Sequence, residues 1–113
     1  MPREWELRLR DILNACYAII AVVKGITFDD FVNDQRNPDS VSFNFIVIGE
    51  AIKDLPDDMT EQFPNIKWKD YAKFRDFLTH RYFDVDINII WEAANTDTYI
   101  LVNMIEELLK VKD

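Results

Sequence analysis

Hydrophobic residues recur every three or four positions along most of the chain. Over residues 3–24 they keep helical spacing with no competing two-residue alternation; they are Trp5, Leu9, Ile12, Cys16, Ile19 and Val23. Gly25 follows directly, and glycine is the residue that most often caps the C-terminus of a helix. The pattern therefore predicts a first long helix that ends at Lys24.

The same spacing predicts the remaining helices, and capping residues mark their starts. Thr27 is suited to cap a short helix, and Asn37 followed by Pro38 is suited to start a long one. The predicted helices cover residues 28–32, 38–55, 57–63, 67–82 and 87–110. Gly49 lies inside the second long helix, where it costs about 1 kcal/mol relative to alanine. Close approach of another helix is the simplest reason for it.

The last predicted helix has more apolar surface than a helix at the edge of a small bundle requires. Its main apolar face includes Ile90 and Leu101. A second, adjacent face carries Ile89, Ala93, Ile100 and Met104. We therefore expect a second buried contact on this helix, most simply the interface of a homodimer.

These elements predict an all-α fold, an up-and-down bundle of four main helices with short helical turns, as one domain over residues 1–113. Two glycines and four prolines are too few for the turns of an all-β domain. The longest apolar run, residues 15–23, is shorter than the roughly 20 residues of a membrane span. The N-terminal segment does not resemble a signal peptide, and one cysteine cannot form an internal disulfide. We therefore expect a cytoplasmic protein with no membrane partner.

The charge of the chain is unevenly distributed. Its net charge is −8, which by itself disfavours nucleic-acid binding. Residues 67–81 nevertheless have a local charge of +3, and the rest of the chain has −11. Such polarity would steer a phosphate-bearing ligand to this helix. It is equally typical of a solvated face or of a docking surface for an acidic protein.

The candidate chemistry is concentrated in the same helix. His80 is the only histidine, so we expect no metal site built on histidine, and Cys16 is expected in the core. Asp76 and His80 are four residues apart, a spacing at which the carboxylate can orient the imidazole. Arg75 and Tyr82 share nearly one face, whereas Arg75 and His80 are about 140° apart around the helix. A two-fold axis near this helix would bring both residues of two copies around one cleft.

That arrangement suits the cleavage of RNA. Attack of a 2′-OH on its own phosphate benefits from a base and an acid, and histidine serves as either near neutral pH. One chain has one histidine, and a homodimer has two. Arginine offers a permanent, planar positive charge for the developing phosphorane. The alternative for His80 is a solvent-facing residue at a helix end, paired with Asp76.

Arg75-Asp76-x-x-x-His80-x-Tyr82 resembles the R-x4-H-x-Y motif of HepT-like proteins, a family of the HEPN superfamily. Further blocks of the family surround this motif in the same order, and matches run from about residue 9 to 109. They are Ile48-Gly49-Glu50-Ala51, Pro64-x-Ile66-x-Trp68, Tyr82-Phe83-x-Val85-Asp86 and Ile90-Trp91. The chain departs from the family where Tyr99 follows Asp97-Thr98, a position near which many members have a proline.

The resemblance implies a homodimeric helical bundle with a metal-independent ribonuclease centre at the dimer cleft. Such proteins are toxins paired with an MntA-type nucleotidyltransferase antitoxin. Arg75 and His80 would be catalytic, and Asp76 would support them. Tyr82 would be AMPylated by the partner, which uses ATP and Mg²⁺, while cleavage itself would need no cofactor. From the local positive charge, Lys73 and Arg81 are expected to contact RNA phosphates.

Two other functions fit the sequence. The chain could be a non-catalytic accessory subunit of a nucleotidyltransferase that binds a nucleotide or the partner. It could also be a plain dimerisation bundle whose basic helix docks an acidic protein. Glu50 could face the cleft or make a contact between helices. The three tryptophans, Trp5, Trp68 and Trp91, fit core or interface anchors better than base-stacking residues.

Overall fold

The computed structural model describes residues 1–111, and all its regular structure is helical. The elements are α1 (Arg3–Val23), α2 (Phe28–Asn33), α3 (Arg36–Lys53), α4 (Asp57–Thr60), α5 (Trp68–His80), η1 (Tyr82–Asp84), α6 (Ile87–Asn95) and α7 (Asp97–Val111). No strand occurs within these residues, which confirms the predicted all-α bundle.

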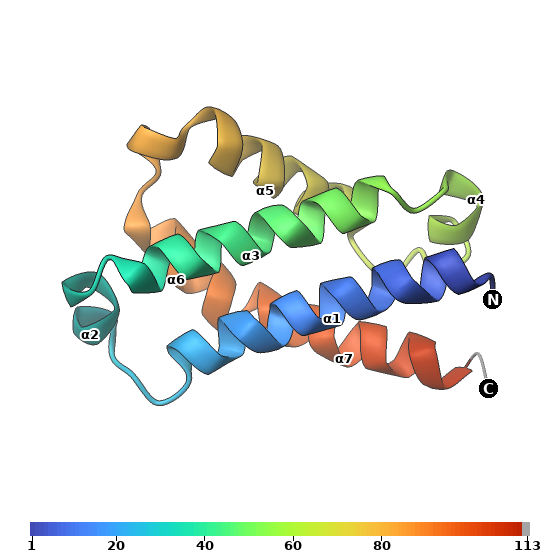
Figure 1. Ribbon diagram of the computed structural model, residues 1–113, viewed down its shortest axis with the longest axis horizontal. Coiled ribbons are helices and arrows are strands. Elements are labelled where there is room, and N and C mark those ends of the chain that lie inside the picture. The colour runs from blue at the N-terminus through green and yellow to red at the C-terminus, as the bar shows by residue number, and fades with distance from the viewer. Residues whose placement is uncertain (112–113) are drawn as a thin grey trace.

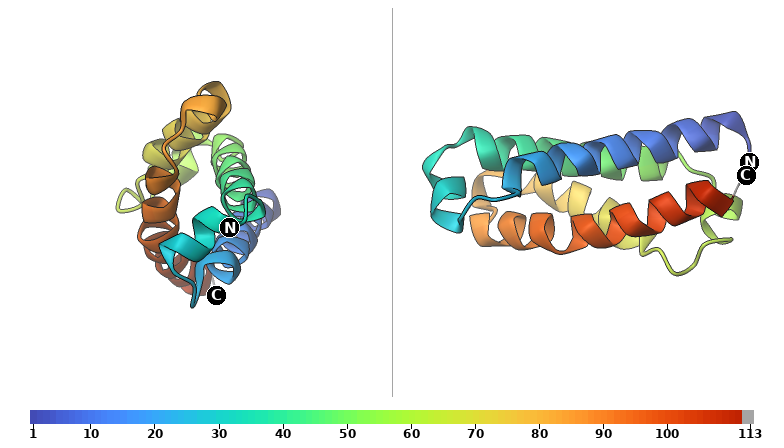
Figure 2. Two further views of the ribbon diagram at one scale, coloured as in Figure 1. Left: turned by 90° about the vertical axis from the view of Figure 1, so that its left-hand side faces the viewer. Right: turned by 90° about the horizontal axis from the view of Figure 1, so that it is seen from below.

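The long helices pack side by side in an elongated bundle (Figure 1). Helix α1 lies between α3 and α7, and α3 lies between α1 and α5. Seen along the bundle, α5 stands at its outer edge, supported mainly by α3 (Figure 2). The N-terminal end of α1 and the C-terminal end of α7 both lie at the end of the bundle away from the C-terminal end of α5 (Figure 1). Among the described helices, none has the length and apolar character to cross a membrane.

The core is formed by the apolar stripes that the periodicity predicts. On α1, Leu9, Ile12, Cys16 and Ile19 have no solvent exposure. Burial of each large aliphatic side chain stabilises the fold by about 1.5–3 kcal/mol. Helices α3 and α7 supply the opposing apolar side chains; Val41, Phe45, Ile48, Leu101, Ile105 and Leu108 are all buried.

The capping residues explain how the chain turns between α1 and α3. Gly25 adopts a φ of +79°, a left-handed conformation that favours glycine. Thr27 and Asp30 form a reciprocal capping box at the start of α2, as the sequence predicts for Thr27. The predicted cap at Asn37 is wrong, because α3 begins at Arg36 after Gln35. Pro38 still lies in the first turn, where its missing N–H breaks no helical hydrogen bond.

The predicted continuous helix over residues 87–110 is wrong, because Thr96 separates α6 from α7. Thr96 has φ −124° and ψ −69°, outside helical geometry. Two side chains bond the last carbonyls of α6: Asn95 donates to Trp91 at 2.9 Å and buried Thr98 donates to Ala93 at 3.3 Å. The Thr98 hydroxyl takes the place of the Asp97 backbone N–H, which would bond the Ala93 carbonyl in a continuous helix. The apolar spacing continues across the break, so periodicity alone did not reveal it.

Candidate active site on helices α3 and α5

The internal glycine of α3 allows α5 to approach closely. A Cβ built on Gly49 would lie 2.2 Å from Cβ and 2.7 Å from Cγ of Arg75. Only a residue without a side chain fits there, because the stem of Arg75 crosses the backbone of α3 at this point. Gly49 therefore fixes the depth at which Arg75 sits between the two helices.

The head of Arg75 belongs to a chain of four charged residues, Glu50 and Lys53 on α3 and Arg75 and Asp76 on α5. We call these four residues the Arg75 network. The guanidinium of Arg75 donates to Glu50 from Nη2 and to Asp76 Oδ1 from Nη1, the latter at 3.1 Å. Lys53 Nζ donates to the same Asp76 oxygen at 2.5 Å. The hydrogen bond from Lys53, and then that from Arg75, lowers the pKa of Asp76 below its ordinary 3.8.

Arg75 is held tightly and yet remains open to solvent on one side. Its side chain is 23% exposed, and Glu50 beside it is half exposed. The buried Nε of Arg75 finds no acceptor among the described residues. A buried donor without a partner is rare in folded proteins. The guanidinium is thus fixed by Glu50 and Asp76, and its unpartnered donor, Nε, is buried.

The predicted pair of Asp76 and His80 is not formed. The carboxylate of Asp76 is engaged by Lys53 from the neighbouring helix and by Arg75. His80, the last residue of α5, is exposed, and no residue between Met1 and Val111 bonds its imidazole. The i, i+4 spacing permits the pair, but the carboxylate bonds Lys53 of α3 instead of His80. His80 therefore presents an unengaged imidazole to solvent.

Tyr82 lies beyond the helix that was expected to carry it. Helix α5 ends at His80, and Arg81 leaves helical geometry with φ −122° and ψ 28°. The expected alignment of Arg75 and Tyr82 on one helical face is therefore wrong. Tyr82 sits in η1, is 58% exposed, and packs edge-on against Phe83 with ring centroids 5.2 Å apart.

The residues expected to bind phosphate lie at the surface. Lys73 is exposed on α5, and Arg81 is exposed with a single long contact of 3.9 Å to Asp84. The local positive charge is smaller than the sequence count suggested, because Glu50 folds against Arg75 and cancels one charge. Within the Arg75 network, two cations meet two carboxylates. The basic character that remains free comes from exposed lysines and Arg81.

The sequence left two questions about this region open, and the geometry answers them. Glu50 makes a contact between helices and also faces solvent beside Arg75. Trp68 is buried and donates from Nε1 to the Phe63 carbonyl at 3.1 Å, and Trp91 packs against Phe31 with centroids 5.0 Å apart. These two tryptophans are core anchors, as expected. Lys53 was not predicted to belong to the site. The one feature of the sequence that points to it is its position one helical turn after Glu50.

This arrangement offers a fixed guanidinium and a free imidazole on one helix. Arginine in such a position can bind a phosphodiester and neutralise charge that develops on it. A free imidazole can accept or donate a proton near neutral pH. In the part of the chain that the structure describes, no group of three or more His, Cys, Asp or Glu residues could hold a metal ion.

Comparison with known proteins places this site in a family. Residues 12–108 match the family described as ribonuclease HepT-like. The chain belongs to the HepT-like family. The resemblance seen in the R-x4-H-x-Y motif and its flanking blocks is therefore confirmed at the level of the family.

Several relatives match over most of the HepT-like chain. One from Methanocaldococcus jannaschii, named as a candidate RNase, is 37% identical over 102 residues, which cover 90% of this chain and 84% of the relative. One from Thermococcus cleftensis, named "Probable ribonuclease HepT", is 34% identical over 97% of this chain and 100% of the relative.

A third relative, also from M. jannaschii, carries a longer chain. It is 34% identical over 100% of this chain but only 50% of its own length, and its name joins a gamma-glutamylcyclotransferase to a candidate RNase. No solved structure matches this chain.

Proposed function

We propose that this HepT-like protein is a metal-independent endoribonuclease toxin that cuts RNA in a cleft between two copies. The observation that carries the proposal is that α5 presents two suitable side chains: an Arg75 held in place by its neighbours, and an exposed His80 whose imidazole is free. Family membership supports the reaction class, because the family is described as ribonuclease HepT-like.

The proposed reaction is attack of a ribose 2′-OH on the adjacent phosphodiester. One His80 accepts the 2′-OH proton as the 2′-O–P bond forms, and a protonated His80 of the second copy donates a proton to O5′ as the P–O5′ bond breaks. Arg75 neutralises the charge that gathers on the phosphoryl oxygens. The products are a 2′,3′-cyclic phosphate and a 5′-OH, so no water, metal or cofactor is consumed.

A homodimer supplies what one copy lacks. A single chain has one histidine, so a base and an acid of this kind require two copies. Large apolar side chains are exposed near the candidate site residues: Phe43 on α3 is 64% exposed and lines a hollow together with Glu50, and Phe83, which follows Tyr82 in η1, is 96% exposed. Exposed aromatic residues are typical of interfaces. Lys73 and Arg81 would then contact RNA backbone phosphates at the rim of the cleft.

Regulation is proposed at Tyr82. An MntA-type nucleotidyltransferase partner would use ATP and Mg²⁺ to AMPylate the exposed phenol. The Tyr82 oxygen attacks the α-phosphorus of ATP, the bond from this phosphorus to the pyrophosphate oxygen breaks, and the phenolic proton passes to solvent. The added phosphodiester brings a negative charge close to the end of α5. It would thereby repel RNA from the site.

The decisive experiment measures RNA cleavage by the purified chain in excess EDTA, after its mass shows that Tyr82 is unmodified. The parent is expected to cut, and His80→Ala is expected to lose activity by about 10²–10⁴-fold. Because His80 is exposed, the variant should keep its fold. Arg10→Ala, which removes a cation on α1 that pairs with Glu6, is the matched control and should cut like the parent. Equal cleavage by His80→Ala would refute the role of His80.

The second candidate is a non-catalytic accessory subunit of a nucleotidyltransferase that binds a nucleotide or the partner. The neutralised charge of the Arg75 network favours it, since Glu50 already occupies the arginine. This alternative predicts a folded, unmodified dimer that binds the nucleotidyltransferase but cuts no RNA in a broad panel.

A further inference from the structure

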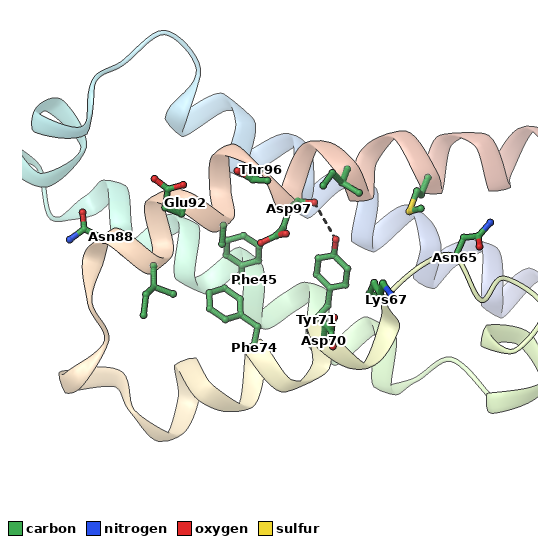
Figure 3. A pocket seen from close by; sticks show the side chains of 14 residues that line it. Phe45, Asn65, Lys67, Asp70, Tyr71, Phe74, Asn88, Glu92, Thr96 and Asp97 are labelled. Carbon is green, nitrogen blue, oxygen red and sulfur yellow. Dashed lines mark hydrogen bonds between the residues drawn. The ribbon is translucent and has the colours of Figure 1, made fainter.

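An open apolar groove of about 870 Å³ separates α5 from α6 and α7 (Figure 3). Its apolar lining consists of Phe45, Phe74, Ile89, Ala93, Ile100 and Met104. The volume falls within the roughly 300–1,000 Å³ that is typical of ligand-binding clefts. We call this feature the α5 groove.

The α5 groove explains the excess apolar surface of the last helices. The face with Ile89, Ala93, Ile100 and Met104 was expected to be buried by a second contact. In the single chain this face lines the groove, and Ile100 is 49% exposed. An exposed apolar surface of this kind is costly in water, and in monomeric proteins it commonly marks a binding site.

The charged residues around the α5 groove are mostly acidic. Asp70, Glu92 and Asp97 line it, against one cation, Lys67. Figure 3 shows Asp97 beside the rings of Phe45 and Tyr71, and the Tyr71 hydroxyl bonds the backbone carbonyl of Asp97 at 3.2 Å. The carboxylate itself has no bonding partner between Met1 and Val111. Burial, and then the charge of Asp70, raises the pKa of Asp97 above its ordinary 3.8, as expected for a carboxylate without a cation.

We propose that the α5 groove binds an apolar segment of a partner protein that directs a lysine or arginine at Asp97. The apolar lining would take up the hydrophobic side chains of the segment. The cation would pair with the unsatisfied carboxylate and lie against the faces of nearby aromatic rings, an additional attraction. This inference goes beyond the ribonuclease proposal and does not rest on it.

Charge decides between the possible occupants. RNA is disfavoured because three carboxylates would face its phosphates. A second copy docked groove to groove is disfavoured as well. Each copy would bring three carboxylates, Asp70, Glu92 and Asp97, against the one cation Lys67, and like charges that meet across an interface cost several kcal/mol. A partner segment with apolar side chains and a lysine or arginine fits both the apolar lining of the groove and its carboxylates.

The α5 groove is separate from the Arg75 network. Phe74 in the groove and Asp76 in the network are two residues apart, so their side chains point about 160° apart around α5. They lie on opposite flanks of this helix. No residue of the Arg75 network lines the groove, and neither does His80, so occupation of the groove should leave Arg75 and His80 open.

The test uses three fluorescent amphipathic 14-residue peptides that differ at one central position on their apolar face: lysine, glutamine or glutamate. Anisotropy with the full chain should rank their affinities in that order. Asp97→Asn should weaken the lysine peptide about tenfold while changing the glutamine peptide little. Ile100→Ala should weaken both. Glu107→Gln, a charge-matched control on the same helix whose acid pairs with Lys110, should change neither.

Several outcomes would overturn the proposal. These are an absence of binding, equal binding of the three peptides, or no effect of Asp97→Asn. A changed oligomeric state of the Asp97→Asn or Ile100→Ala variant in sedimentation would instead assign the groove to a second copy. The peptide assay does not depend on RNA cleavage, so its failure and a failure of the ribonuclease proposal are read separately.

Discussion

Replacement of Gly49 by alanine should lower the rate of RNA cleavage strongly while lowering the free energy of unfolding only slightly. The added Cβ would lie 2.2 Å from Cβ of Arg75, whereas ordinary contacts begin at 3.4 Å, so the two atoms must move apart by about 1.2 Å. Neither atom can rotate away, because each is bonded directly to its own backbone. Helix α5 must therefore shift relative to α3 and carry Arg75 and Asp76 with it.

The cost to stability should be small. Overpacking a close contact costs about 1–3 kcal/mol, and alanine returns about 1 kcal/mol of helix propensity relative to glycine. We expect a net loss of about 0–2 kcal/mol in the free energy of unfolding. A displacement of about 1 Å at a catalytic group can cost roughly 100-fold in rate. Activity should thus fall far more than stability.

The chain contains one other glycine, and it provides a matched control. Gly25 has a φ of +79° and no atom within 4 Å of a built Cβ. Gly25→Ala should destabilise the fold by about 1–2 kcal/mol through backbone strain, yet leave the cleavage rate of the folded protein unchanged. Urea denaturation and RNA cleavage measured on both variants check the pattern. Activity of Gly49→Ala within threefold of the parent would refute the claim that this glycine positions Arg75.

Three further predictions concern other parts of the fold. Because burial raises the pKa of Cys16 to about 12, this thiol should resist Ellman's reagent in native protein and react at once in urea; fast native labelling would contradict its place in the core. Asp76 has a lowered pKa, so its contribution to stability is present above pH 3.8 and is lost as the pH falls through that lowered value. The difference in unfolding free energy between the parent and Asp76→Asn should accordingly shrink below about pH 4 in urea titrations, and a constant difference would argue against the ion pairs. Thr27→Ala removes a capping box and should cost about 1 kcal/mol, whereas Thr60→Ala, at the half-buried end of α4 where the hydroxyl caps no helix N-terminus, should cost less in the same denaturation experiment.

Much of the fold follows from relations within single helices, which spacing reports directly. The buried stripe of α1, the N-cap at Thr27 and the need for a small residue at position 49 could all be predicted. The break at Thr96 could not, because it depends on side-chain bonds from Asn95 and Thr98 rather than on apolar spacing. Side chains that bond helix carbonyls can end a helix without changing the spacing of its apolar residues, so the break leaves no trace in that spacing.

In the candidate site, too, features within one helix could be predicted and contacts between helices could not. The motif singled out Arg75 and His80 as candidates, and α5 carries both of them. The partners of Asp76 and Arg75 come from α3, about 25 residues away in sequence, and no spacing rule within α5 reveals them. Glu50 and Lys53 are ordinary surface residues until the approach at Gly49 brings the two helices together.

The placement of the chain ends has a consequence for how this unit is used in larger proteins. The N-terminal end of α1 and the C-terminal end of α7 lie together, at the end of the bundle away from the part of α5 that carries His80 (Figure 1). A domain joined at either end can therefore be added without covering that histidine. The longer relative from M. jannaschii, of which this chain spans half, is a polypeptide of that kind.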